Sequence, residues 1–466
     1  MEFPAAAIAV ALLTSLAVTA LSYLASTKAS RYPPGPKGWP LIGNLLDAPK
    51  PGLEWVAYHE MCKKNNSDMV YLNILGRSVL VLDSAEAIND LLDKRSNIYS
   101  SRPWVIMLSS ELMDWFWNFT LTQYGNQWRT HRRLFQSEFN IRAASSHQPQ
   151  QMQGAHRLLG RLLGLERSDQ WRKHLRHQIG ETILDVAYGI KALPEDDPFI
   201  KLAEESIAVT SAASMPGRFL VETVPILKYV PAWMPGASFQ RVAQKGKAIL
   251  RDAAELPFEL AKRDMADGTA QPSFTLNCLQ RNSLGGDVMY EESVIKECAA
   301  VIFAAGADTT VSALSTFTLA MIQHPETSLP YISAIVKECL RWEVVAPIAF
   351  PHQSTTDDVY RGYHIPAGTM VIPNSWAVLN DERTYPDPFT FNPDRFMKGG
   401  SLDPSVPDPE AAFGYGRRVC PGRYMARDTL WINIASILAC FNLENPLDAH
   451  GNAFEQSVKY IPEQIR

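Results

Sequence analysis

The sequence predicts a mainly α-helical protein with small β-sheets, formed by a single large domain behind an N-terminal transmembrane helix. Three observations predict this fold class: an uncharged run at the N-terminus, two short segments with strand character, and helical periodicity over most of the remaining chain. The 466 residues are 46% hydrophobic, which is enough to bury a large core. The net charge of −5 argues against a nucleic-acid-binding protein.

The N-terminal run extends from Phe3 to Thr27 without a charged residue or a histidine. As a helix rising about 1.5 Å per residue, it exceeds the ~30 Å hydrocarbon core of a bilayer. Glu2 precedes the run and Lys28 follows it, so the positive-inside rule places the rest of the chain in the cytosol. The alternative is a signal peptide cleaved near Ala20, but the run is long and lacks a positively charged start.

Residues 1–27 are therefore expected to form a transmembrane anchor and residues 28–50 a proline-rich hinge. Four prolines and three glycines between Arg31 and Asn44 exclude a helix there. Proline fixes φ, so the segment is interpreted as a semi-rigid spacer, with an ordinary linker as the alternative. The folded domain then comprises residues 51–466.

Two segments are predicted to form strands. Tyr71–Ser84 and Gly362–Trp376 each contain apolar residues around a glycine, so each is expected to supply two short strands about a turn. We expect one small sheet near the start of the domain and a second one later in the chain.

The longest predicted helix runs from about Asp287 to Ile322 and is apolar on nearly every face after Ala299. Its middle contains Gly306, which costs about 1 kcal/mol in a helix, and then Asp308–Thr310, which compete for backbone hydrogen bonds. One interpretation is a helix facing a small polar cavity. The other is a bulge that aims an acid and an alcohol at a cofactor.

Three charged residues are candidates for a buried network. Glu338 and Arg341 share a helical face with apolar neighbours, and Arg395 follows later in the chain. A solvated surface salt bridge worth under ~1 kcal/mol is the ordinary alternative for such a pair.

A single cysteine lies within the stretch Phe413–Gly422. The other five are Cys62, Cys278, Cys298, Cys339 and Cys440, and no pair has metal-finger, redox or disulfide-framework spacing, which favours a reducing compartment. Pro421 suits the first position of a helix, so Cys420 is expected at a helix N-terminus, where the dipole and nearby arginines lower a thiol pKa. A lone thiolate without histidine suits one axial bond to a cofactor metal.

Five motifs resemble those of the cytochrome P-450 superfamily and occur in the same order. Phe413–Gly422 fills every fixed position of the haem-binding loop Phe-x-x-Gly-x-Arg-x-Cys-x-Gly, and Ala305–Thr310 resembles the oxygen-activation motif. The Glu-x-x-Arg, Pro-x-Arg-Phe and Trp-x-x-x-Arg motifs are matched at Glu338–Arg341, Pro393–Phe396 and Trp128–Arg132. The anchor and hinge resemble the membrane-bound microsomal class, and the sequence around the motifs resembles fungal members.

The resemblance implies a cytochrome P-450 fold in which residues 51–466 bind haem b (iron protoporphyrin IX). Cys420 would be the axial ligand, and Trp128, Arg132 and Arg418 would bind the haem propionates. His352 would do the same or be a plain polar residue at a strand end. Phe413 would pack near the sulfur, and Gly422 would complete the loop.

On the oxygen side, the resemblance implies that Ala305 and Gly306 leave room above the iron. Thr309 would hydrogen-bond the bound oxygen species, and Asp308 would relay protons. Glu338, Arg341 and Arg395 would brace the loop before Cys420.

The implied activity is a monooxygenase of secondary metabolism that inserts one atom of O2 into a lipophilic small molecule. No nucleotide-binding motif is found, so NADPH–cytochrome P-450 reductase, with cytochrome b5 as a further donor, would supply electrons. A basic face is the expected docking surface, with a solvated face as the alternative; its residues are Arg129, Arg133, Arg417 and Arg427. Residues 105–119 would line an apolar pocket, and residues 216–236 would dip into the endoplasmic reticulum membrane or pack in the core.

Two departures from the family pattern favour an alternative. The chain lacks the helix that members place after Glu326, and it stops where members continue into a C-terminal hairpin. The alternative is a haem protein without oxygenase turnover, which is either inactive or catalyses a rearrangement. A third interpretation is a secreted protein that binds no haem.

Overall fold

The computed structural model describes residues 32–50, 52–165, 170–215, 217–283, 291–323 and 332–445. The fold is mainly helical with small sheets. Its contacts divide into two compact units, one of residues up to Pro103 together with Phe350–Asn374, the other of Trp104–Ala349 together with the residues from Ser375 on. The predicted anchor (1–27), the position after Glu326 where a helix of the family pattern is expected to be missing, and the C-terminal end lie outside the described residues.

The smaller unit contains a four-stranded sheet beside short helices. Its elements are η1 (Leu45–Asp47), α2 (Glu54–Lys64), β1 (Met69–Ile74), β2 (Arg77–Leu82), α3 (Ala85–Ile88), η2 (Asn89–Lys94), α4 (Ser96–Tyr99), β3 (His352–Gln353), β4 (Asp358–Tyr360), β5 (Tyr363–Ile365) and β6 (Met370–Pro373).

The sheet has the strand order β1-β2-β6-β3. The strands predicted in Tyr71–Ser84 form a hairpin, in which Gly76 adopts a φ of +83° at the turn. The prediction for Gly362–Trp376 was correct in strand position but wrong in pairing. β5 pairs with β4 in a separate two-stranded sheet, while β6 pairs parallel with β2 in the first sheet, so β5 and β6 do not form a hairpin with each other.

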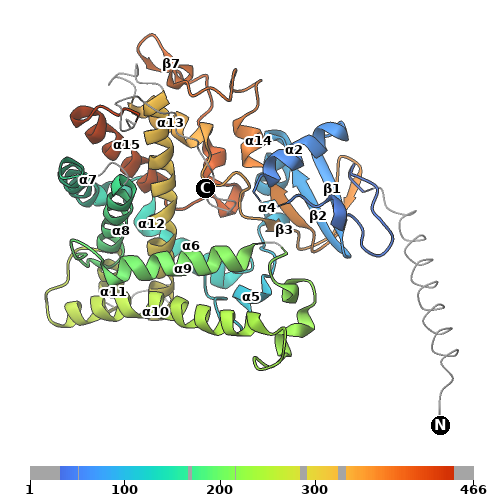
Figure 1. The fold of residues 1–466 in the computed structure, drawn as a ribbon, viewed down its shortest axis with the longest axis horizontal. Helices are drawn as coiled ribbons and strands as arrows, with labels where there is room; N and C mark the ends of the chain where they lie inside the picture. Colours follow the sequence, from blue (N-terminus) through green and yellow to red (C-terminus); the bar gives the residue numbers. More distant parts are fainter. Residues whose placement is uncertain are drawn as a thin grey trace, which may run out of the picture. The chain divides into compact units, whose positions relative to one another are not determined.

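The larger unit contains most of the helices (Figure 1). Its elements are α5 (Ile106–Ser109), α6 (Asn126–Phe139), η3 (Ala144–His147), α7 (Gln148–Leu163), α8 (Trp171–Tyr188), α9 (Pro198–Ser214), η5 (Leu220–Glu222), η6 (Pro225–Tyr229), α10 (Ser238–Ala266), α11 (Phe274–Ser283), α12 (Glu292–Gln323), α13 (Ile332–Trp342), α14 (Ser375–Leu379), η9 (Pro393–Phe396), β7 (Met397–Lys398), β8 (Ser401–Leu402), η10 (Glu410–Phe413), η11 (Gly416–Arg418) and α15 (Arg423–Cys440).

Local signals explain several helix ends. The Asp197 carboxylate accepts hydrogen bonds from the amides of Phe199 and Ile200, which caps α9 at its N-terminus. Gly189, with a φ of +73°, ends α8 in the left-handed conformation that glycine adopts without strain.

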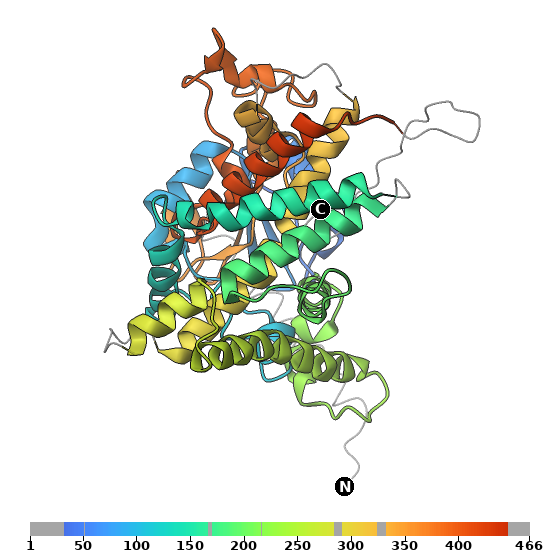
Figure 2. The ribbon, with the colours of Figure 1, turned by 90° about the vertical axis from the view of Figure 1, so that its left-hand side faces the viewer.

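The core of the larger unit forms around α12, which contacts α6, α8, α9, α10, α11, α13 and α15. Figure 2 shows α15, α7 and α8 side by side. Among the described helices, α12 alone is long and apolar enough to span a membrane, and 67% of its most apolar window is buried inside the protein. This burial identifies α12 as a core helix, as the sequence predicts.

Candidate functional site

The loop that holds Cys420 is closed by its own backbone. The amide of Cys420 donates a hydrogen bond to the carbonyl oxygen of Phe413 across 2.7 Å. Gly414 and Gly416 have φ values of +79° and +54°, a region that favours glycine. The helix begins at Arg423 with Gly422 as its N-cap, so the expectation that Pro421 starts the helix is wrong by two residues. Cys420 therefore lies just outside the helix N-terminus.

Burial dominates the electrostatics of the thiol. It raises the pKa of Cys420, whereas the Gly422 amide and the guanidinium groups of Arg132 and Arg423 lower it. The expectation of a lowered pKa is therefore wrong for the free thiol, because desolvation outweighs these neighbours. A cation bound to the sulfur would supply the missing compensation.

Arginines from two elements hold this loop in place. Arg132 of α6 donates to the carbonyl oxygen of Val419 at 2.7 Å, and burial lowers its pKa to about 10, so it stays positively charged near neutrality. Arg418 donates to the carbonyl oxygens of Phe119 and Thr122 at 3.0 and 2.6 Å. Of the predicted propionate ligands, the structure thus places the two arginines, Arg132 and Arg418, at the cysteine loop.

Aromatic rings lie against one arginine of the cysteine loop and one of α15. The Arg418 guanidinium lies 4.7 Å from the ring centre of Trp128, and that of Arg427 lies 5.0 Å from the ring centre of Phe413. Arg423, which the sequence analysis did not select as a site residue, donates to the carbonyl oxygen of Cys420 at 3.2 Å. Its place three positions after Cys420 in the sequence is the signal that could have found it.

One stretch of α12 is open, although most of the helix is buried. Ala305 is exposed, and Gly306, Asp308 and Thr309 are half-buried. The Thr309 hydroxyl donates to the carbonyl oxygen of Ala305 at 2.9 Å. Of the two interpretations of this segment, the bulge is wrong, because α12 is a continuous α-helix from Glu292 to Gln323.

Gly306 lies against α8. A Cβ built on it would come within 3.0 Å of the Cδ1 atom of Ile183, so the missing side chain lets the two helices approach closely. This packing contact explains the glycine locally, and its predicted role toward oxygen stays a prediction.

Asp308 forms an ion pair that the sequence analysis missed. Its Oδ1 atom lies 3.4 Å from the Nη2 atom of Arg176 on α8, and its side chain is 25% exposed. The partner is 132 positions earlier in the chain, so local spacing gave no signal for it.

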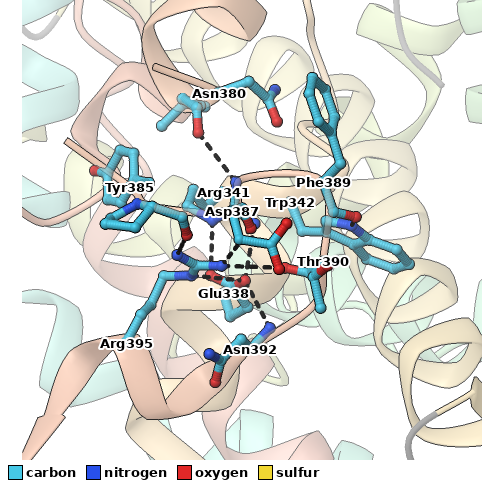
Figure 3. Close-up of polar contacts among 12 residues, drawn as sticks. Glu338, Arg341, Trp342, Asn380, Tyr385, Asp387, Phe389, Thr390, Asn392 and Arg395 are labelled. Atoms are coloured by element: carbon cyan, nitrogen blue, oxygen red, sulfur yellow. Dashed lines mark hydrogen bonds and ion pairs between the residues drawn. The ribbon is translucent and has the colours of Figure 1, made fainter. Parts of the chain in front are cut away.

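Figure 3 shows two arginines, Arg341 and Arg395, gathered around the carboxylate of Glu338. Both side chains of the Glu338–Arg341 pair are fully buried, with Nε–Oε2 and Nη2–Oε1 distances of 2.7 and 2.8 Å. Arg395 Nε and the Asn392 amide donate to Glu338 at 3.1 and 2.9 Å. Arg395 also binds three carbonyl oxygens, those of Pro386, Asp387 and Thr390. The network thus ties α13 to the segment before the cysteine loop.

His352 belongs to the smaller unit. It is buried in β3, and its Nδ1 atom lies 2.7 Å from the carbonyl oxygen of Tyr99 in the same unit. Its assignment to the propionates stays a prediction.

The chemistry of this site fits a haem. A half-buried thiol near the guanidinium groups of Arg132 and Arg423 suits a bond between sulfur and iron, and arginines at the loop suit the two haem propionates, because arginine is the natural partner of carboxylates. The described residues contain no cluster of three or more histidine, cysteine or acidic side chains that could hold a metal ion. A single protein ligand to iron is consistent with this donor set.

Comparison with known protein families gives a match to the family described as Cytochrome P450, over residues 33–328 and 327–464. The tryptamine 4-monooxygenase of Psilocybe cyanescens is 40% identical over 96% of this chain and 93% of its own length. Cytochrome P450 monooxygenase 98 of Postia placenta is also 40% identical, over 90% of this chain and 85% of its own length. The P450 monooxygenase ple1 of Rhodocybe pseudopiperita is 38% identical, over 94% and 88%.

Proposed function

Because this chain belongs to the cytochrome P450 family and is a P450 monooxygenase, we propose that Cys420 is the one protein ligand of a haem b iron. The observation that carries this proposal is the half-buried thiol with Arg132 and Arg423 as its positive neighbours. When bound, the haem supplies the redox chemistry that activates dioxygen. Binding of the sulfur to a cation also favours loss of the thiol proton, which offsets the effect of burial.

The arginines serve the haem carboxylates in this proposal. Arg132 and Arg418 are charged donors at the loop, and Trp128 fixes the Arg418 guanidinium by stacking. Phe413 and Gly422 shape the loop through their backbone contacts with Cys420. His352 is a further candidate for a propionate, on the resemblance to the family alone.

Thr309 and Asp308 handle protons. The Thr309 Oγ1 atom donates to the Ala305 carbonyl oxygen, and as a hydroxyl oxygen it can still accept a hydrogen bond. Asp308, one residue earlier, can exchange protons with water because its side chain is partly exposed. The pair would hold and orient a proton at the Thr309 Oγ1 atom, while Ala305 leaves space beside it.

A separate NADPH–cytochrome P-450 reductase would supply electrons, with cytochrome b5 as a further donor. Two arginines of the predicted basic face, Arg129 and Arg417, stack on the same Tyr124 ring at 5.2 and 5.1 Å. This arrangement concentrates positive charge beside the cysteine loop, which supports docking of an acidic protein. Arg427 contributes less, because Glu410 pairs with it at 2.6 Å.

The protein is proposed to be a single-pass protein of the endoplasmic reticulum membrane with its catalytic domain in the cytosol. Residues 1–27 would anchor it, on the sequence argument alone. A second contact with the membrane is supported by four large apolar or aromatic side chains of the larger unit, which are 68–78% exposed: Leu220, Ile226, Tyr229 and Trp233.

The proposed substrate is a lipophilic small molecule of fungal secondary metabolism. An apolar cluster that includes Ile106, Met107 and Leu108 supports this, since residues 105–119 are where the family places substrate contacts. The relatives above are fungal monooxygenases, and one of them is named for tryptamine.

Oxygenation in membranes tests this proposal. The full chain is co-expressed with an NADPH reductase, and the microsomes receive tryptamine and other lipophilic compounds under isotope-labelled dioxygen. The expected result is a product that carries one labelled oxygen atom and requires both NADPH and reductase. A haem protein that gives no labelled product with any compound contradicts the proposed turnover.

That second outcome corresponds to the alternative of a haem protein without oxygenase turnover. One observation favours it: the family match is in two parts that meet at residues 327–328, next to the position after Glu326 where the sequence is expected to lack a helix of the family pattern. The alignment with the Psilocybe enzyme spans 481 positions, more than the 466 residues of this chain, so it contains gaps in this chain.

A further inference from the structure

Three helices contribute one charged residue each to a cluster at Asp308. Arg176 of α8 lies between two carboxylates, with its Nη2 atom 3.4 Å from Asp308 Oδ1 on α12 and its Nε atom 3.9 Å from Glu204 Oε1 on α9. All three side chains are partly buried, with exposed fractions of 25% to 42%. One guanidinium therefore serves two carboxylates.

The packing of α8 on α12 fixes where Arg176 can reach. Ile183 of α8 lies against Gly306, and Tyr188 of α8 meets the Phe303 ring edge-on at 6.1 Å. The later residue of α8, Tyr188, thus contacts the earlier residue of α12, Phe303. The two helices therefore run antiparallel to each other. Arg176 lies about two helical turns before Ile183 on α8. In this antiparallel arrangement it therefore lies beside the part of α12 that follows Gly306, where Asp308 is.

The cluster contains two carboxylates but only one guanidinium group. Burial raises the pKa of Glu204, Asp308 raises it further, and Arg176 opposes both. With two carboxylates and one cation, protonation of Glu204 leaves Arg176 to Asp308 alone. Glu204 thus weakens or strengthens the hold on Asp308 according to its own charge.

We propose that Arg176 is a positioning residue, which directs the Asp308 carboxylate beside Thr309, and that Glu204 competes for it. This inference rests on the proposed function, because it assumes that Asp308 moves protons. A carboxylate at 3.4 Å from a guanidinium has a preferred direction, whereas an unpaired aspartate samples several rotamers. Removing the guanidinium should therefore make proton delivery less productive without disturbing haem binding.

The first test measures the contact without any turnover. The midpoint of thermal unfolding is compared for the haem-bound parent, Arg176→Gln, Asp308→Asn and the double variant. If the pair exists, the two shifts are not additive, and the double variant unfolds no earlier than the more sensitive single variant. Additive shifts would overturn the inference.

The second test measures the role in the reaction. Product formed per NADPH consumed should fall about twofold or more in Arg176→Gln and recover in Arg176→Lys, with KM and the reduced carbon-monoxide spectrum unchanged. Arg172→Gln is the matched control, since it removes an exposed arginine from the same helix one turn earlier. Glu204→Gln should form at least as much product per NADPH consumed as the parent, because it removes the carboxylate that competes with Asp308 for Arg176.

The outcomes separate this inference from the proposed function. A parent that forms product while Arg176→Gln couples equally well overturns the positioning role alone. Equal losses in Arg176→Gln and Arg172→Gln also overturn it, because a general charge effect would explain both. A parent that forms no product overturns the proposed function and, with it, the positioning role.

Discussion

The amide nitrogen of Cys420 lies 2.7 Å from the carbonyl oxygen of Phe413, so the loop closes on itself just before α15 begins. Arg132 and Arg423 bind the carbonyl oxygens on either side, those of Val419 and Cys420. The thiol is therefore fixed by the backbone around it. This rigidity is what a single metal ligand requires, because no second side chain of the protein corrects its position.

Removing the charge of Glu338 should strongly destabilise the larger unit. Glu338→Gln keeps the shape of the side chain but leaves Arg341 and Arg395 without their buried carboxylate, which should cost about 3–5 kcal/mol. The yield of haem-bound protein and the midpoint of thermal unfolding measure this. Glu60→Gln is the control, because its pair with Lys63 is exposed and worth under about 1 kcal/mol. Equal effects of the two variants would contradict a structural role for the network.

A side chain at Gly306 should be tolerated only if Ile183 is made smaller. Gly306→Val should lower the midpoint of thermal unfolding, because its Cβ would lie 3.0 Å from Ile183. Ile183→Ala should relieve this loss, so that the double variant is more stable than the two single effects predict. Gly160→Val is the control, since a Cβ there meets open space. Strict additivity at Gly306 would show that the two helices do not touch there.

Removing the hydroxyl of Thr309 should uncouple electron use from product formation. Thr309→Ala should keep the haem and consume NADPH but release more hydrogen peroxide and less product, because a methyl group cannot orient a proton. The loss of stability should be small, since alanine is the better helix former. Thr318→Ala removes a similar hydroxyl, bonded to the Leu314 carbonyl oxygen on the same helix, and should leave the ratio unchanged. Less product with unchanged peroxide would remove Thr309 from proton delivery.

Stability should decrease in mild acid, partly through His147. Burial lowers the pKa of His147, although Glu138 acts in the opposite direction. Because an unfolded histidine titrates near 6.5, the unfolded chain binds the proton first, so the free energy of unfolding falls as the pH drops below about 6.5. His147→Phe removes this titration and keeps a ring against Phe139, whose centre lies 5.2 Å away.

The midpoint of thermal unfolding should then depend less on pH in His147→Phe than in the parent. The slope should shrink without vanishing, because burial also lowers the pKa of His177. His156→Gln, at an exposed position of α7, is the control and should keep the pH dependence of the parent. An identical slope in His147→Phe would exclude this histidine as a source of acid sensitivity.

Local patterns in the sequence predicted elements well and their partners poorly. The alternation around Gly76 located β1 and β2, because hairpin partners are neighbours in the chain. The parallel pairing of β2 with β6 joins residues about 290 positions apart, and no local pattern encodes it.

The same division holds in the site. Glu338 and Arg341 were found because they are three positions apart on one helix, whereas Arg176 and Asp308 come from different helices. The thiol pKa was predicted in the wrong direction because adjacent arginines are visible in sequence and burial is not. A bulge was one of two interpretations of the segment at Gly306, but α12 is continuous there and the glycine packs against Ile183, a contact that local sequence does not reveal.

The reduced carbon-monoxide spectrum of the full chain in membranes tests the central claim most directly. Parent, Cys420→Ala and Cys440→Ala are compared, the last as a control at an exposed cysteine. We expect the red-shifted Soret band of a thiolate-bound haem in the parent and in Cys440→Ala, and its loss in Cys420→Ala. A red-shifted band that persists in Cys420→Ala would contradict the assignment of Cys420 as the iron ligand.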